Sequence, residues 1–217
     1  MKQLRITSQV LAVLFAFGIA ASSTGLAAEG LLPQQGEKGA SGEGGEVVTS
    51  NLNKEELKCK DILVLNWRFL TGSNIHGSAE FHFTGCTVLG FAANTLGDAS
   101  GVVLRRRLFL LCLRNPKTLV FGVLLQSEET VHIEVPALKA LLLEKGAIIA
   151  ENLSGNKGKE FTFAAQAGDP AVAECEIEGK IFKNSLELAV DTKSDVDASE
   201  TITLKLKFGE EVELMDK

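Results

Sequence analysis

A strict alternation of apolar and polar residues runs through the segment TITLKLKF at positions 201–208. Its even-numbered positions are Ile, Leu, Leu and Phe, and its odd-numbered positions are Thr, Thr, Lys and Lys. Successive side chains of an extended chain point to opposite faces, so this period of two is typical of a strand with one buried face. A chain built from such segments must bury one face of a sheet.

The same pattern recurs along the chain and predicts an all-β fold. In ILVLNWRFL (62–70), we expect Leu63, Leu65 and Trp67 to share the buried face. Two further segments, LFLLCL and LVFGVLL, are apolar throughout, which indicates strands that are covered on both faces. The other predicted strands are AEFHF (79–83), TVHIEV (130–135), KEFTF (159–163), AVAECEI (171–177) and KIFKNSLELAV (180–190).

Short connections rich in Gly, Asn, Asp and Pro separate these segments, which favours a mainly antiparallel β-sandwich or β-barrel. The pattern allows at most one short helix, which Pro136 would open and Gly146 would close.

The first 28 residues predict a secretory signal peptide. Lys2 and Arg5 precede an apolar run from Val10 to Ala21, and small residues follow it. The run is shorter than the roughly 20 apolar residues of a transmembrane helix, and we expect no membrane span in the mature chain. The sequence therefore predicts a secreted or extracellular protein, or a periplasmic or cell-surface one.

Composition divides the rest of the chain in two. Residues 29–46 are rich in Gly and Glu and predict a flexible leader, and residues 47–217 predict a single β-rich domain of ordinary size. Removal of the signal peptide would take the net charge from −6 to −8 by removing two basic residues. This acidity argues against nucleic acid as a partner.

Four cysteines, at positions 59, 86, 112 and 175, predict two disulfides in an exported chain. Three pairings are possible, and we favour Cys59–Cys86 with Cys112–Cys175. No two cysteines are close enough in sequence for the usual zinc-ligand pair.

The favoured pairing requires Cys59 and Cys86 to lie on the same face of the sheet. In the hairpin that Cys59–Cys86 would staple, the expected buried positions are odd-numbered on both strands, as is Cys59, whereas Cys86 is even-numbered. A one-residue β-bulge at Gly85 would turn Cys86 inward. Without such a bulge, Cys59 could pair with Cys112 instead.

Two short motifs, FTGC (83–86) and AECEIEG (173–179), follow the predicted signal peptide. With it they resemble a pattern of small secreted β-rich proteins of actinobacterial type, a group without an assigned function. The resemblance implies a secreted β-rich protein and no site residues.

Metal binding is the first chemistry to consider. His82 and His132 lie on the polar phase of their predicted strands, each beside a glutamate, and neighbouring strands would bring them together. The acidic segment 191–200 contains Asp191, Asp195 and Asp197 and could hold calcium, although it lacks the EF-hand pattern. The alternative is that all five residues are ordinary solvent-facing groups.

The other candidate binding site is a cluster of arginines. Arg105, Arg106 and Arg107 form the one basic cluster, and the strand period places the first and third on one face. They could guard a sheet edge or bind an anion. The sequence contains no nucleophile elbow, zincin motif or P-loop, so it identifies no catalytic residue and no cofactor site.

These observations favour a secreted, non-catalytic binding or structural β domain, with an extracellular protein or a small molecule as possible partner. An alternative is a lipocalin-like carrier of a small apolar ligand, lined by segments 108–113 and 119–125 with 140–143 as a lid. A third hypothesis is an uncharacterised hydrolase. Sugar binding is disfavoured because the chain has no Tyr and its single Trp falls in a core phase.

Overall fold

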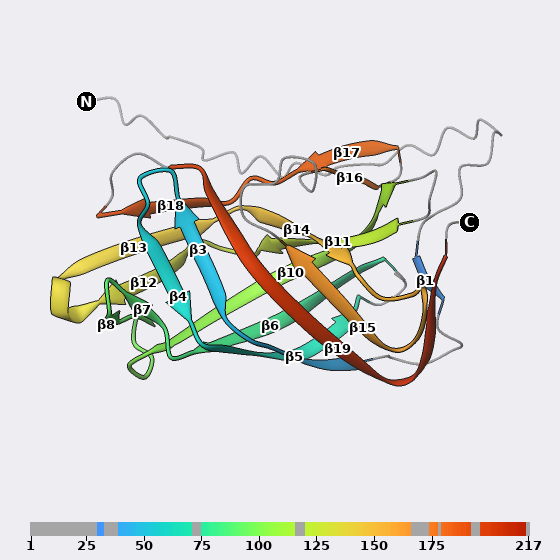
Figure 1. Cartoon of the computed structure of the whole chain (residues 1–217), viewed down its shortest axis with the longest axis horizontal. Coiled ribbons are helices and arrows are strands. Elements are labelled where there is room, and N and C mark those ends of the chain that lie inside the picture. The colour runs from blue at the N-terminus through green and yellow to red at the C-terminus, as the bar shows by residue number, and fades with distance from the viewer. Residues whose placement is uncertain are drawn as a thin grey trace, which may run out of the picture.

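The structure is a computed structural model whose elements are almost all β-strands (Figure 1). The predicted signal peptide lies outside the described residues, as does Asp195. The described part of the chain holds no helix with the length and apolarity that a membrane crossing requires. The structure describes residues 30–32, 39–70, 75–115, 120–165, 174–177, 179–191 and 196–215.

Eight antiparallel strands close into a barrel, because the first and the eighth strand of the sheet, β15 and β19, also pair with each other. The all-β, antiparallel prediction is confirmed, and the barrel is the correct one of the two architectures considered. In order around the barrel the strands are β15 (Lys157–Ala165), β14 (Ala147–Asn152), β11 (Val120–Ser127), β10 (Val102–Asn115), β6 (His76–Thr84), β5 (Asp61–Phe69), β2 (Gly39–Gly44) and β19 (Ala198–Met215).

One end of the barrel, on the left in Figure 1, carries additional strands. The first residues of β19 leave the barrel wall and pair with β3, which continues the sheet through β4, β7 and β8, while four other strands form a separate sheet. The continuation is β3 (Val47–Asn51), β4 (Glu56–Cys59), β7 (Thr87–Val88) and β8 (Phe91–Ala92). The separate sheet is β18 (Glu187–Val190), β13 (Ala140–Lys145), β12 (Val131–Val135) and β9 (Asn94–Thr95). Three short strands remain: β1 (Gly30–Leu32), β16 (Glu174–Ile177) and β17 (Lys180–Lys183).

The helix expected between Pro136 and Gly146 is wrong. Pro136–Leu138 form one turn of 3-10 helix, η1, and the chain then enters β13. Because β13 pairs with β12 on one side and β18 on the other, two rows of backbone hydrogen bonds override the helix propensity of ALLLEK.

The flexible-leader prediction is wrong for Gly39–Gly44, which form strand β2 between β5 and β19. Glycine is required there by close contact rather than by turn geometry. A Cβ at Gly42 would lie 2.6 Å from a methyl carbon of Leu206, and one at Gly44 would lie 2.3 Å from the carbonyl oxygen of Thr203. The composition that suggests a linker is therefore the composition of a closely packed strand.

Strand β5 departs from its expected phase. The pairing of β5 with β6 shifts register between Leu65 and Arg68, and Asn66 has a positive φ of 52°. Asparagine tolerates this left-handed conformation better than most residues. The bulge turns Trp67 into the core, whereas Leu63 and Leu65 are exposed to 49% and 39%, so the expected burial of these two leucines is wrong.

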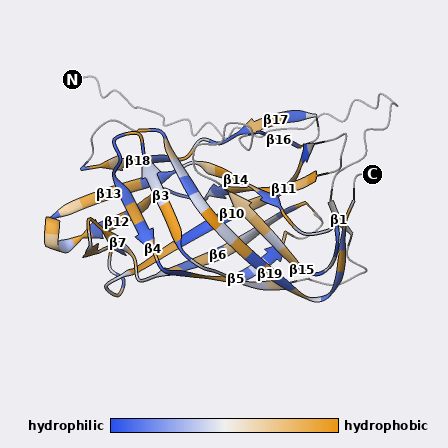
Figure 2. Cartoon of the chain, in the orientation of Figure 1, coloured by the Kyte–Doolittle hydropathy of each residue, from blue (hydrophilic) through white to orange (hydrophobic). Residues whose placement is uncertain are grey.

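Side chains of β5 and β10, the two strands that flank β6, meet over β6 inside the barrel. Trp67 stacks on Phe109 with ring centroids 3.9 Å apart, and a Cβ at Gly77 would lie 2.0 Å from the Phe109 ring. The predicted burial of Phe81 and Phe83 is confirmed. Figure 2 shows hydrophobic and hydrophilic residues interspersed along the same strands, as the period of two requires.

Both expected disulfides are confirmed, Cys59–Cys86 and Cys112–Cys175. The expected bulge at Gly85 is wrong, because Asp61 faces Thr84 and Lys58 faces Thr87, so the strands keep one register across the bridge. Instead both strands change face together at this point, where Gly85 has a φ of 63°. The two cysteines therefore lie directly opposite each other.

The Cys112–Cys175 bridge lies on the outer side of the barrel wall. Cys112 belongs to a second apolar cluster with Leu124, Ile149, Cys175 and Ile177, separate from the main core. The hairpin of β16 and β17 is fastened over this cluster, which explains why β10 and β11 are apolar on both faces, as predicted.

Candidate functional site

The structure does not bring the two candidate histidines together. His82 lies on β6 of the barrel wall, with its Nε2 atom 4.0 Å from Glu80, whereas His132 lies on β12 of the separate sheet. Within the described ranges, no group of His, Cys, Asp and Glu side chains has the arrangement of a metal site.

Two aspartates of the predicted acidic loop are described. The Asp191 carboxylate accepts a hydrogen bond of 3.0 Å from the Leu141 amide, and the Asp191 amide donates one of 2.8 Å to the Leu141 carbonyl. Asp191 thus closes the end of the β13–β18 pair. Asp197 forms an isolated β-bridge with Glu187, and its carbonyl accepts a hydrogen bond from Leu52.

The arginine cluster divides as the strand period predicts, but both roles considered for it are wrong. Strand β10 is central, since it pairs with β6 and β11, so the arginines guard no edge. Arg106 is exposed near Glu80, whereas Arg105 and Arg107 are buried inside the barrel and bind protein carboxylates.

Arg105 and Arg107 form a buried ion cluster with Glu144, Glu200 and Thr49. The guanidinium of Arg107 binds both oxygens of Glu200, each at 3.0 Å. Arg105 binds Glu144 and Glu200, and the Thr49 hydroxyl donates a hydrogen bond of 3.1 Å to Glu200. The cluster therefore ties β10 of the barrel to the start of β19, to β3 and to β13 of the separate sheet.

Aromatic rings complete the surroundings of the cluster. The Arg105 guanidinium lies 4.2 Å from the centroid of the Phe83 ring, and that of Arg107 lies 5.5 Å from Phe81. Two guanidinium groups and two carboxylates balance in charge, which is how buried ions are normally accommodated. Because its members come from different sheets, the cluster acts as a cross-link between them.

Burial raises the pKa of each glutamate in the cluster, and the neighbouring arginines lower it. Burial alone would raise the pKa of Glu200, but Arg107 and Arg105 outweigh it and lower that pKa to about 2. Burial dominates at Glu144, whose pKa is raised despite the nearby arginines. The pKa of Arg107 is raised because the two glutamates outweigh the opposing effect of burial.

A pH-dependent stability follows from Glu200. Its pKa is about 2 in the folded chain and about 4.3 in an unfolded one, so its ionised form stabilises the fold above about pH 5, and this contribution is lost as the pH falls toward 2. We expect the stability difference between the wild type and Glu200→Gln to shrink over this range, as measured by urea unfolding at pH 7, 5 and 3. A difference that stays constant with pH would contradict the assignment.

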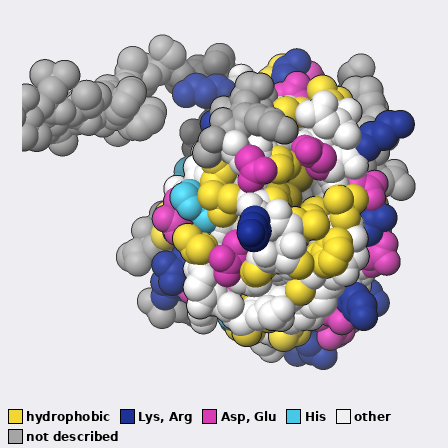
Figure 3. Space-filling view, turned by 90° about the vertical axis from the view of Figure 1, so that its left-hand side faces the viewer, with side chains coloured by type: hydrophobic (Ala, Val, Ile, Leu, Met, Phe, Trp, Pro, Cys, Tyr) yellow, Lys and Arg dark blue, Asp and Glu magenta, His cyan; other side chains and the backbone are white. Residues whose placement is uncertain are grey.

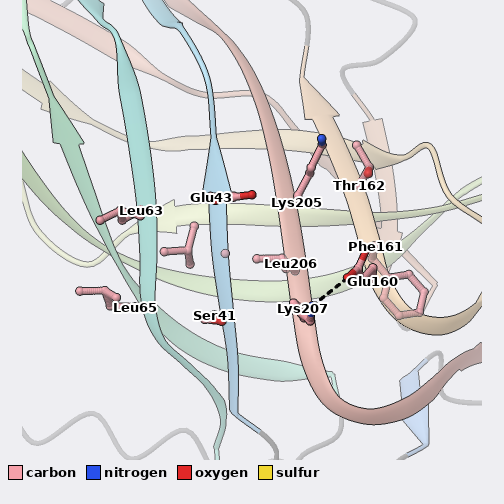
Figure 4. A pocket seen from close by; sticks show the side chains of 12 residues that line it. Ser41, Glu43, Leu63, Leu65, Glu160, Phe161, Thr162, Lys205, Leu206 and Lys207 are labelled. Carbon is pink, nitrogen blue, oxygen red and sulfur yellow. Dashed lines mark ion pairs between the residues drawn. The ribbon is translucent and has the colours of Figure 1, made fainter.

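A second feature is a trough on the outside of the barrel, with a volume of about 480 Å³ (Figure 4). It runs over β2, whose sequence GASGEG supplies few bulky side chains, so the taller side chains of the flanking strands stand above it as walls. Leu63 and Leu65 of β5 form the apolar wall, and Lys205 and Lys207 of β19 form the charged wall.

The pairing register orders the trough into two transverse rows of side chains. Lys207 is paired with Glu160 at 3.1 Å, as drawn in Figure 4. One row is Leu63, Glu43, Lys205 and Thr162, and the other is Ser41, Lys207 and Glu160, with Leu65 lining the trough where the pairing of β2 with β5 shifts register. The trough therefore passes from apolar side chains on β5 to charged and polar ones.

Sequence reasoning missed both features. For the ion cluster a signal was present, because Arg105 and Arg107 share the phase of Phe109, and Glu200 shares that of Ile202. For the trough, the period of two groups Leu63 and Leu65 with Trp67 on the buried face. The sequence does not mark the bulge at Asn66 that separates them. Comparison with known protein families, with curated proteins and with solved structures finds no match to this chain.

Proposed function

We propose that the protein is a secreted, non-catalytic binding domain, and that the trough over β2 binds an extended peptide segment of an extracellular partner protein. The observation that carries this proposal is the exposure of Leu63 and Leu65 along one wall of a preformed hollow. Two disulfides and the signal-peptide pattern of residues 1–28 support export.

The chemistry of the trough favours a peptide over other ligands. Its volume of about 480 Å³ falls within the usual range for ligand sites. An extended peptide presents side chains alternately to its two sides, so apolar ones could contact Leu63 and Leu65 while polar ones contact the lysines. The one aromatic lining residue, Phe161, is buried, so the trough offers no stacking platform for a sugar.

The carrier alternative receives less support from the described residues. The inner faces of β10 and β11 contribute Phe109, Leu111, Phe121 and Val123 to a packed core instead of a cavity wall. Residues 140–143, the expected lid, belong to strand β13.

Selection from a library of random linear peptides against the oxidised protein tests the proposal. We expect the selected peptides to lose at least tenfold in affinity for Leu63→Glu, because a carboxylate would replace part of the apolar wall. Ser41→Trp should have a similar effect by filling the floor, and Leu153→Glu, on the connection from β14 to β15, serves as the control.

Isothermal titration calorimetry of one selected peptide against the three variants gives the affinities. Peptides that bind Leu63→Glu and Ser41→Trp as tightly as the wild type would refute the trough as the site. Failure to select any peptide would refute the proposed function itself.

A further inference from the structure

We infer that the end of the barrel bearing β7, β8 and η1 docks on a lipid surface through three apolar side chains, Leu89, Phe91 and Leu138. These residues are exposed to 79%, 45% and 37% respectively. They are called here the apolar tips. The inference concerns a different surface from the trough and does not depend on the proposed function.

The apolar tips belong to two neighbouring turns. Leu89 and Gly90 form the two-residue turn between β7 and β8, since Val88 faces Phe91. Leu138 ends η1, which contacts β8. Figure 3 faces this end of the molecule and shows hydrophobic side chains gathered around a basic one, with acidic side chains among them.

The backbone of the first turn points to a role for Leu89. Leu89 and Gly90 have φ angles of 51° and 83°, the geometry of a type I′ turn, whose first position favours Asn, Asp or Gly. A bulky residue in the left-handed region is strained, and such strain is found where the side chain serves a function. Here the strained residue is a leucine that projects into solvent.

Lysines accompany the apolar tips in the manner of membrane-surface proteins. Lys139 follows Leu138 directly and is exposed, while Lys54 and Lys58 line a hollow of about 190 Å³ together with Leu89. Lysine side chains at an interface can reach the phosphate groups while neighbouring apolar groups enter the acyl region. Glu56 pairs with Lys58 at 2.7 Å and Glu46 also acts on Lys58, so these carboxylates offset most of the lysine charge and a zwitterionic lipid is the fitting partner.

The same features argue against a protein partner at this end. Protein interfaces are anchored mainly by Trp, Tyr and Arg. The apolar tips and the lysines beside them include none of these three residue types. Apolar tips on projecting turns suit insertion into a fluid surface better than packing against a rigid one.

Co-sedimentation with sucrose-loaded phosphatidylcholine vesicles tests the inference. The chain is used without residues 1–28, because the apolar run Val10–Ala21 would bind lipid by itself. We expect Leu89→Asn to lower the partition coefficient about tenfold or more, because it removes an apolar side chain from the inserted surface. Its thermal midpoint should not fall, because Asn suits the left-handed position better than Leu.

Leu153→Asn is the matched control, since Leu153 is 62% exposed on the connection between β14 and β15, which do not pair with β7 or β8. It should bind vesicles as the wild type does. The inference is overturned if the wild type does not sediment with the vesicles, or if Leu89→Asn binds them as well as the wild type.

Discussion

Replacing Glu200 with alanine is expected to lower the free energy of unfolding by about 3–5 kcal/mol, the usual cost of removing one partner from a buried ion pair. Glu200 binds both arginines of the cluster, and its side chain is fully buried. Without it, Arg105 and Arg107 share the single carboxylate of Glu144, which leaves an uncompensated positive charge inside the barrel.

Urea unfolding with both disulfides intact gives the free energy, and Glu160→Ala is the control. Glu160 also pairs with a basic residue, Lys207, but both side chains are 71% exposed, so we expect a change below about 0.5 kcal/mol. If Glu200→Ala does not fold, Glu200→Gln provides the comparison. A loss below about 1 kcal/mol for Glu200→Ala would show that the cluster contributes little to stability.

Loss of the Cys112–Cys175 bridge should be the second large effect. For the double replacement Cys112→Ala with Cys175→Ala, the entropy of the unfolded loop predicts a loss of about 4 kcal/mol, since the bridge spans 63 residues. The shorter span of 27 residues for Cys59–Cys86 predicts about 3.5 kcal/mol. The hairpin of β16 and β17 should also detach, because Leu113 is the one residue of β10 that pairs with it in the part of the chain that the structure describes.

Two measurements separate these consequences. Denaturant unfolding of the two double variants shows which bridge contributes more to the free energy of unfolding. Hydrogen exchange shows whether the hairpin of β16 and β17 still covers Leu124 and Ile149. We expect faster exchange in β16, β17 and the adjoining part of β11 only when the longer bridge is absent. Equal protection in both variants would mean that the hairpin is held by its other contacts.

The periodic strands are the part of the fold that the sequence predicts well. The apolar phases of TITLKLKF and AEFHF, the double burial of β10 and β11, and both disulfide pairs are confirmed. These features follow from short-range rules, because the strand period depends only on neighbouring residues. Closure into a barrel depends on pairing between β15 and β19, which no local pattern specifies.

The failures share a physical reason, which is that tertiary contacts reverse the local preference. The composition of Gly39–Gly44 predicts a linker, but atoms of β5 and β19 pack so closely against this segment that larger residues would not fit at Gly42 and Gly44. ALLLEK favours a helix until two strands flank it. The local pattern does not predict burial of Arg105 and Arg107, because the carboxylate partners, Glu144 and Glu200, lie 39 and 95 residues from Arg105 in the sequence.

Strand β19 has a consequence for how the protein reaches its native state. It pairs with β2 near the start of the described chain and with β15, and its earlier residues join β3. Until β19 is available, β2 and β15 present unpaired backbone groups to their surroundings. Because the barrel closes only when these distant segments meet, we expect slow assembly, with a half-open intermediate that is prone to aggregate and benefits from a holdase.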